Sequence, residues 1–241
     1  GGKPLPESTK RYIRTWKQFL PDYSITEWNE TNCSIQSAPD YVREAYEAGK
    51  YAFVSDYVRV QKLLQYGGIY FDTDVEVVRP FEQYLEGHSM VMGFEGERSL
   101  TTAFIACCEG HPFMEEFEKS YHTRHFLAQD GSMDLTVIND GFSRQAGEWG
   151  IDLSRNEYQE TDQKIAVYPA AYFSAFDIQN WHELGQLSKG RPFEGFLVFP
   201  LDQPHFAPSA VEGGFAHAAF PHGFFHAEPL LFPHPDDGFS S

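Results

Sequence analysis

The amino-acid sequence predicts an α/β domain with a mainly parallel sheet flanked by helices. Helical stretches alternate with short apolar strands along most of the chain, which is the pattern of such a domain. The composition then changes near Gly190, because the residues after it include 10 of the 22 Phe and 8 of the 15 Pro. We therefore expect a domain over residues 1–190 and a Phe/Pro/His-rich tail of irregular structure over residues 191–241. Pro at that density excludes long helices and central strands.

The first element that we expect is a helix over residues 8–20. Tyr12, Ile13 and Trp16 fall on one apolar stripe at helical spacing, and Pro21 follows its end. Residues 23–28 alternate in polarity as a strand does. Gly67-Gly68 ends a longer helix in the manner of a left-handed cap. By the same criteria we expect further helices over residues 40–48, 52–66, 111–122 and 135–149, and strands over residues 69–71, 90–94, 102–106 and 164–168.

The charge balance excludes several classes of partner. The 241 residues include 18 Lys or Arg and 35 Asp or Glu, so the formal net charge is −17. Such a surface repels the phosphates of nucleic acid and of anionic lipid, so we expect no nucleic-acid partner. An anionic substrate would have to be held by a metal ion or a local Arg.

The segment with the strongest chemical signal runs from Asp56 to Asp74. Asp56 and Arg59 are three residues apart on an expected helix and therefore share a face. Asp72 and Asp74 directly follow a short apolar strand, and in an extended backbone both would point the same way. Ligands of open α/β sheets bind beyond the carboxyl ends of the strands. Two carboxylates at that place suit a Mg²⁺ or Mn²⁺ ion that also bridges a diphosphate.

Each part of this segment also has a plainer explanation. An Asp-x-Asp pair occurs by chance in many loops, and Asp56 with Arg59 could form only a surface ion pair of little energetic value. The ordered combination of helix, double glycine, buried strand and two carboxylates favours a functional site.

This combination resembles a known family. The stretches Asp56-Tyr57-Val58-Arg59 and Tyr66-Gly67-Gly68-Ile69-Tyr70-Phe71-Asp72-Thr73-Asp74 closely resemble the DXD sugar-binding region of a glycosyltransferase family. That family includes yeast Golgi initiating mannosyltransferases and bacterial capsule and lipopolysaccharide enzymes, and the clostridial glucosylating toxins share the motif. The likeness extends from Gly1-Gly2-Lys3-Pro4 to Tyr168-Pro169-Ala170-Ala171-Tyr172-Phe173.

The resemblance implies a GT-A fold, which is Rossmann-like, and a retaining transfer of a hexose from a nucleotide-sugar donor to a glycan acceptor of a surface polysaccharide. UDP-hexose and GDP-mannose are both compatible with the motif. The implied cofactor is Mn²⁺ or Mg²⁺, with Asp74 as a metal ligand. Asp72 would contact the donor ribose and sugar hydroxyls and share in the metal shell. Asp56 and Arg59 would hold the donor sugar, and Arg59 would also contact phosphate.

The remaining implied roles concern the backbone and the reaction. Gly67 and Gly68 would allow the turn that lets the strand deliver the two aspartates. Tyr70 belongs to the implied donor-binding set, although a place in the core is favoured for it and for Phe71. Metal and Arg59 would neutralise the departing diphosphate. A front-face attack by the acceptor hydroxyl is implied, because no second carboxylate stands out as a covalent nucleophile.

Two features depart from the family pattern. Family members place an apolar strand directly before the Gly-Gly-Lys-Pro stretch, and we expect that first strand to be missing here. They also carry a His- and Trp-containing segment after the Tyr-Pro block, whereas here Trp181-His182 comes too early and the His residues of the tail have no spacing typical of metal ligands. These departures favour, as an alternative, a catalytically degenerate metal-dependent binder of nucleotide sugars.

Another alternative is a haloacid-dehalogenase-like phosphatase. A strand followed by Asp72-Thr73-Asp74-Val75 is how such enzymes present their aspartyl nucleophile. They usually place it on the first strand, however, and they need a later Lys and an acidic pair on a strand end. Asp236-Asp237 lies in the Pro-rich tail and is a poor candidate for that pair.

Two further segments have open interpretations. Residues 130–136 fall where such enzymes place a loop that faces donor or acceptor, but Asp134 as the N-cap of a following helix explains them equally well. Glu95, Glu97 and Arg98 follow an expected strand and could meet the acceptor, although solvated loop charges are favoured.

The cellular location is a softer inference. Cys33, Cys107 and Cys108 make no disulfide framework, so we expect reduced thiols. No apolar run approaches the roughly 20 residues that span a bilayer. We expect a bacterial cytoplasmic location, with a peripheral association with the inner membrane left open.

Overall fold

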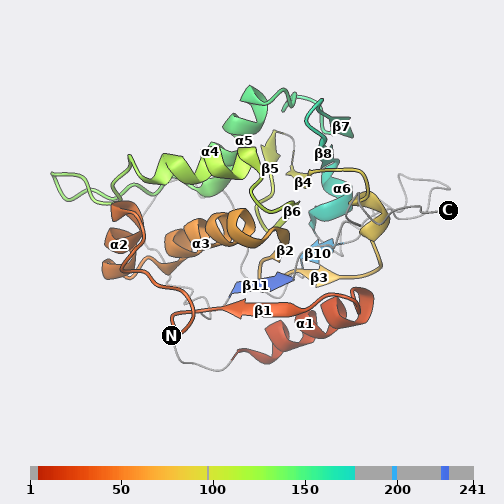
Figure 1. Ribbon diagram of the computed structural model, residues 1–241, viewed down its shortest axis with the longest axis horizontal. Coiled ribbons are helices and arrows are strands. Elements are labelled where there is room, and N and C mark those ends of the chain that lie inside the picture. The colour runs from red at the N-terminus through yellow and green to blue at the C-terminus, as the bar shows by residue number, and fades with distance from the viewer. Residues whose placement is uncertain (1–4, 97, 177–196, 200–223, 228–241) are drawn as a thin grey trace, which may run out of the picture.

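The computed structural model describes residues 5–96, 98–176, 197–199 and 224–227 (Figure 1). Its helices are α1 (Glu7–Phe19), α2 (Asp40–Glu47), α3 (Tyr51–Tyr66), α4 (Pro112–Tyr121), α5 (Ile138–Glu148) and α6 (Ala170–Phe173), with a 3-10 turn η1 (Glu82–Tyr84). The strands are β1 (Ile25–Trp28), β2 (Gly68–Phe71), β3 (Glu76–Val77), β4 (Met90–Glu95), β5 (Ser99–Leu100), β6 (Phe104–Cys107), β7 (Gln159–Glu160), β8 (Ile165–Tyr168), β9 (Ala175–Phe176), β10 (Leu197–Phe199) and β11 (Phe224–Ala227). Every helix and strand expected from the sequence is present, with ends that shift by a few residues.

The main sheet is mixed, so the prediction of a mainly parallel sheet is wrong. Its strand order is β1-β11-β2-β6-β4-β8-β7, with β5 paired to β4. Among these described pairs only β4 and β8 run parallel. The connection from β4 to β6 covers residues 96–103, which is shorter than the roughly dozen residues that a helical crossover needs. The chain therefore returns antiparallel, and β2 and β4, which both pair with β6, point the same way.

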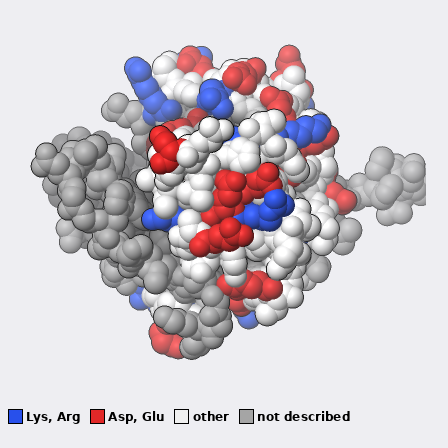
Figure 2. Space-filling view, turned by 90° about the vertical axis from the view of Figure 1, so that its left-hand side faces the viewer, with Lys and Arg blue, Asp and Glu red and all other residues white. Residues whose placement is uncertain are grey.

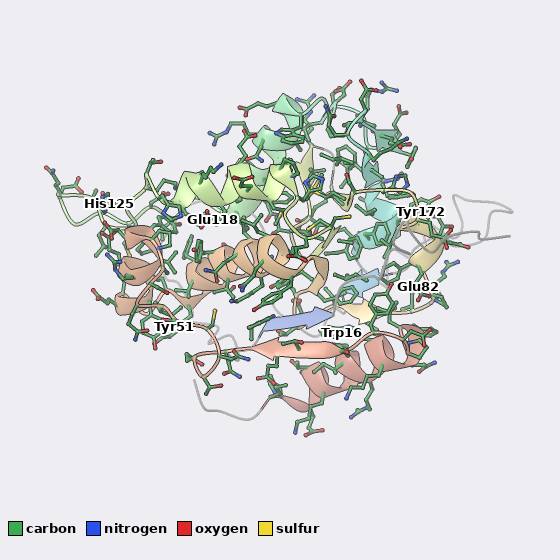
Figure 3. All side chains as sticks on the ribbon, viewed as in Figure 1. Trp16, Tyr51, Glu82, Glu118, His125 and Tyr172 are labelled. Carbon is green, nitrogen blue, oxygen red and sulfur yellow. The ribbon has the colours of Figure 1, made fainter. Side chains whose placement is uncertain are left out.

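Helices cover both faces of this sheet and create two apolar cores (Figure 1). Alternate residues of β2 serve the two cores, because successive side chains of a strand point to opposite faces. Tyr70 packs with residues of α2, α3, α4 and α5 in the larger core. Ile69 and Phe71 pack with α1, β3 and α6 in the second core. Trp16 of α1 belongs to that second core and donates from Nε1 to the backbone oxygen of Val75 at 2.8 Å (Figure 3).

The tail contributes a strand to the interior of the sheet. β11 lies between β1 and β2 and pairs antiparallel with both. This corrects the expectation that the Pro content of the tail excludes central strands. The reason is local, since Pro221 and Pro229 flank the strand and residues 224–227 contain no Pro. The expected domain boundary near residue 190 and most of the tail, including Trp181-His182 and Asp236-Asp237, lie outside the described residues, as do Gly1–Pro4 and Glu97.

The structure describes all three cysteines and the length and polarity of its helices. Cys33, Cys107 and Cys108 are free thiols, and burial raises the pKa of each. Within the described part of the chain, no helix is both long and apolar enough to cross a membrane.

Candidate functional site

The two aspartates of the motif follow β2 in a tight turn. The four residues of β2 are buried, and the Asp72 amide donates to the Ala103 carbonyl at 2.9 Å, which extends the pairing with the neighbouring chain by one residue. The Val75 amide then donates to the Asp72 carbonyl at 3.1 Å and closes a turn over residues 72–75. The expectation of an extended Asp-x-Asp is therefore wrong: the turn, and not strand alternation, decides how Asp72 and Asp74 are presented.

Arg59 is the buried centre of the site. Its side chain is only 6% exposed. Nη1 donates to the Thr102 carbonyl at 2.6 Å and to Thr102 Oγ1 at 3.2 Å. Nη2 lies 2.9 Å from Asp56 Oδ1 and 3.3 Å from Asp72 Oδ1. One guanidinium thus joins the helix that carries Asp56 to the strand end that carries Asp72. The shared helix face of Asp56 and Arg59 was predicted from their spacing, whereas the contact with Asp72 was not.

Burial and charge act in opposite directions on this pair. Burial is the largest influence on Asp56 and raises its pKa to about 6, while the charge of Arg59 lowers it and the charge of Asp72 raises it again. Burial also opposes the charge of Arg59, but the charges of Asp72, Tyr70 and Asp56 raise its pKa above the ordinary value. Arg59 therefore stays cationic, and two carboxylates share one cation. The excess of negative charge favours binding of a further cation at this edge.

Tyr70 is a core residue, as we expected from the sequence, and it contacts both Arg59 and Asp72. It is 3% exposed, and the Arg59 guanidinium lies over its ring with Cζ 4.7 Å from the centroid. Its hydroxyl donates to Asp72 Oδ1 at 2.6 Å. Asp72 is thus oriented by a hydroxyl and a guanidinium at the same oxygen.

The double glycine is required by the backbone at this point. Gly67 has φ +64° and ψ −158°, which is not the left-handed helical cap that we expected but a conformation nearly confined to glycine. A Cβ on Gly67 would lie 2.5 Å from the Glu109 amide nitrogen. Gly68 has φ +94°. The chain can therefore turn from α3 directly into β2 and pack closely against the end of β6.

The donor atoms available for a metal are carboxylate oxygens. Asp72 and Asp74 are both partly exposed at the turn, and hard divalent cations such as Mg²⁺ commonly take one or two carboxylates together with waters and substrate phosphates. The described residues contain no group of three or more His, Cys, Asp or Glu arranged to hold a metal ion. Among the described residues, Asp72 and Asp74 therefore offer carboxylate ligands for part of a cation's shell, and a substrate diphosphate would complete it.

A hydrogen-bonded row continues the site across the sheet edge. Thr102 Oγ1 donates to Asn139 Oδ1 at 2.8 Å, and Asn139 Nδ2 donates to Glu95 Oε2 at 2.6 Å. Burial first and the charge of Asp72 second raise the pKa of Glu95, whereas the Asn139 hydrogen bond lowers it. The expectation that Glu95 is a solvated loop charge is therefore wrong. Thr102 and Asn139 belong to no sequence motif, so the sequence did not predict their place in the site.

A loop beside α4 approaches the site from the other side. Arg124 pairs with Asp134 at 2.7 Å, lies over the Tyr41 ring with Cζ 4.5 Å from the centroid, and lowers the pKa of Asp56 through its charge. Asp134 also accepts from the Thr136 amide at 3.1 Å, and α5 begins only at Ile138, so Asp134 is not the N-cap that we considered.

The first residues of the same loop make hydrogen bonds with Glu44 of α2. His125 Nδ1 lies 2.8 Å from Glu44 Oε1, at the left-hand end of the molecule in Figure 3. Glu44 Oε2 accepts from the amides of Phe126 and Leu127. On the face at that end, acidic side chains gather in the middle beside basic ones (Figure 2).

Comparison with known proteins gives a match to a family model. Residues 6–91 match the family model described as a glycosyltransferase sugar-binding region containing a DXD motif. The matched segment includes Asp56, Arg59, Asp72 and Asp74, and it runs from just before α1 into β4. No curated protein matches the chain. The match supports a glycosyltransferase, and the mixed sheet flanked by helices is consistent with a GT-A-like fold.

Proposed function

We propose that this protein is a metal-dependent retaining glycosyltransferase of GT-A fold that transfers a hexose from a nucleotide-sugar donor to a glycan acceptor. The observation that carries the proposal is the Arg59-centred network at the end of β2. It joins Asp56 to Asp72 inside the segment that matches the DXD sugar-binding region. The position also suits a ligand, since open α/β sheets bind at the carboxyl ends of their strands.

The contacts of Arg59 favour a positioning role over the phosphate contact that the resemblance implied. Its Nη1 and Nη2 groups face Thr102, Asp56 and Asp72, which are all protein acceptors. We therefore assign Arg59 the task of holding the two carboxylates in place. Asp56 and Asp72 would then present carboxylate oxygens to the hydroxyls of the donor sugar and ribose.

Asp74, with a share from Asp72, would hold the Mn²⁺ or Mg²⁺ ion. Such an ion would supply positive charge to the leaving nucleoside diphosphate. The chain itself offers the oriented carboxylates, and the buried guanidinium limits the repulsion between them. Because Asp72 Oδ1 already accepts from Tyr70 and pairs with Arg59, it is better suited to binding than to attack as an aspartyl nucleophile. This disfavours the phosphatase alternative.

The proposal is tested by isothermal titration of UDP and GDP, each with and without Mn²⁺. We expect one nucleotide to bind only with Mn²⁺, and Asp74→Ala to weaken that binding at least about 10-fold, which corresponds to the loss of a charge-assisted ligand. Asp162→Ala is the matched control, since Asp162 is exposed in the turn before β8. Binding of neither nucleotide, or equal binding by Asp74→Ala, would contradict the proposal.

Turnover separates an enzyme from the degenerate binder. The sugar nucleotide that corresponds to the bound nucleotide, UDP-hexose or GDP-mannose, is incubated with the wild-type chain, Mn²⁺ and a panel of methyl hexosides as acceptors, and released nucleoside diphosphate is measured. Release that Asp74→Ala abolishes supports an active glycosyltransferase. Metal-dependent binding without release would favour the binder.

The biological setting follows from the same proposal. We place the reaction in surface polysaccharide synthesis, in the bacterial cytoplasm and at the inner membrane. Apolar side chains on the loop beside the site support a peripheral contact, because Met133, Leu135 and Val137 are 42%, 47% and 52% exposed. Co-sedimentation with phosphatidylcholine vesicles tests it, and the replacement of Leu135 and Val137 by Ser is expected to abolish it.

A further inference from the structure

A second carboxylate stands at the same sheet edge as the aspartate pair. β2 and β4 both run antiparallel to β6, so both strands deliver their last residues to one edge. Asp72 directly follows β2, Glu95 ends β4, and Thr102 lies between them just before β6. Neighbouring strands are about 4.8 Å apart, so β2 and β4 are separated by about 10 Å where both pair with β6, and Glu95 itself pairs with Ser99 of β5.

Glu95 is fixed from one side by a relay that begins at Arg59. Arg59 donates to Thr102 Oγ1, this hydroxyl donates to Asn139 Oδ1, and Asn139 Nδ2 donates to Glu95 Oε2 at 2.6 Å. Each group in the row donates in the same direction, so the row also assigns the orientation of the Asn139 amide. The relay couples the position of Glu95 to that of the guanidinium that holds Asp56 and Asp72.

The other oxygen of Glu95 is left for a ligand. Among the residues that the structure describes, none donates a hydrogen bond to Oε1. The side chain is neither sealed in the core nor fully exposed. A carboxylate held at one oxygen and open at the other is suited to accept a hydrogen bond from a sugar hydroxyl.

We propose that Glu95 is an acceptor-binding residue, whose Oε1 accepts a hydrogen bond from a hydroxyl of the acceptor sugar. This inference rests on the proposed glycosyltransferase function. The acceptor is favoured over the donor because Asp72, which we assign to the donor, follows β2, and β2 and β4 lie on opposite sides of β6. Asn139 is the positioning residue that turns Oε1 toward the acceptor.

Glu95→Gln tests the role of that oxygen. The Gln amide oxygen can still accept from Asn139, whereas its amide group replaces the acceptor atom Oε1 with a donor. We expect unchanged binding of the nucleotide with Mn²⁺, within about 2-fold, and unchanged hydrolysis of the sugar nucleotide by water. Transfer of labelled hexose to a panel of methyl hexosides should show a KM for the hexoside raised roughly 10- to 100-fold, as expected for a lost charge-assisted hydrogen bond.

Three comparisons make the outcome decisive. Glu86→Gln, at an exposed site in the segment between β3 and β4, is expected to leave every readout unchanged. Asn139→Ala should raise the KM for the hexoside in the same way as Glu95→Gln. If Glu95 had only a structural role, Glu95→Gln would have a lower Tm and an unchanged KM for the hexoside. That result would overturn the inference, whereas the proposed function would still be supported by metal-dependent nucleotide binding. Failure of the wild-type chain to bind either nucleotide would overturn both.

Discussion

Replacement of the buried guanidinium is the sharpest test of the network at the end of β2. Arg59→Leu removes a side chain that is 6% exposed and leaves Asp56, 15% exposed, and Asp72 without their shared cation. Breaking a buried pair by removing one partner costs about 3–5 kcal/mol, because the remaining charge stays buried without compensation. We expect that loss in the free energy of unfolding at pH 7.5, measured by urea denaturation.

The chain contains a matched control for this prediction. Asp40 and Arg43 have the same residue types at the same spacing on α2, but their side chains are 52% and 46% exposed. Arg43→Leu should therefore cost less than about 1 kcal/mol. The contrast between the two variants isolates burial from residue chemistry.

The pH dependence of Arg59→Leu gives a second readout with a definite sign. The pKa of Asp56 is about 6 in the folded wild type, above the roughly 3.9 of an unfolded chain. Loss of Arg59 removes the charge that lowers it, so the folded pKa rises further. A carboxyl with a raised folded pKa stabilises the fold when protonated, and this contribution is lost as the pH rises through the folded pKa. The penalty of Arg59→Leu relative to wild type should thus be smaller at pH 5 than at pH 7.5, by at least about 1 kcal/mol. Equal penalties at the two pH values, or equal penalties for Arg59→Leu and Arg43→Leu, would refute the reasoning.

Two further predictions concern stability. His111 is 4% exposed, and burial lowers its pKa to about 4. The stability that the neutral, buried His111 contributes is fully present above the unfolded pKa of roughly 6.5. As the pH falls toward 4, up to about 3 kcal/mol of the free energy of unfolding is lost. His111→Asn removes the titrating ring but keeps a cap for the Phe113 amide. The free energy of unfolding in urea should therefore differ less between pH 7 and pH 4.5 in this variant than in wild type. A difference as large as that of wild type would count against this assignment. Gly67→Ala should cost more than about 2 kcal/mol, because strain at positive φ is joined by the clash with the Glu109 amide. Gly49→Ala, at φ +70° with open space around the Cβ, should cost only about 1 kcal/mol, and similar losses for both glycines would show that the close packing at Gly67 is unimportant.

The elements that depend on local signals were predictable. The apolar stripe of α1, the glycines that end α3 and the apolar run of β2 each lie within a few consecutive residues. Asp56 and Arg59 share a helix face because helical spacing alone places them there. These features need no knowledge of the rest of the chain.

The direction in which two strands pair depends on the length of the connection between them. The alternation of helices and strands in the sequence did not show that direction. The short connection over residues 96–103 turns β6 antiparallel, and β11 enters the sheet from far along the chain. The predicted topology was wrong for one reason. Strand pairing depends on contacts between segments that are distant in the sequence, and the pattern within one segment does not determine its partner.

The sequence by itself determined that helices and strands alternate, and it supplied an Asp-x-Asp after a buried strand with an Asp and an Arg on one helix face. Only the tertiary structure decided that Arg59 is saturated at both Nη groups by Thr102, Asp56 and Asp72. It also decided that Glu95 joins the site through Asn139. The physical reason is that these contacts link α3, β4, β6 and α5, whose approach is determined by sheet pairing and burial, and a residue without a local motif acquires a role only when that packing brings it to the shared edge.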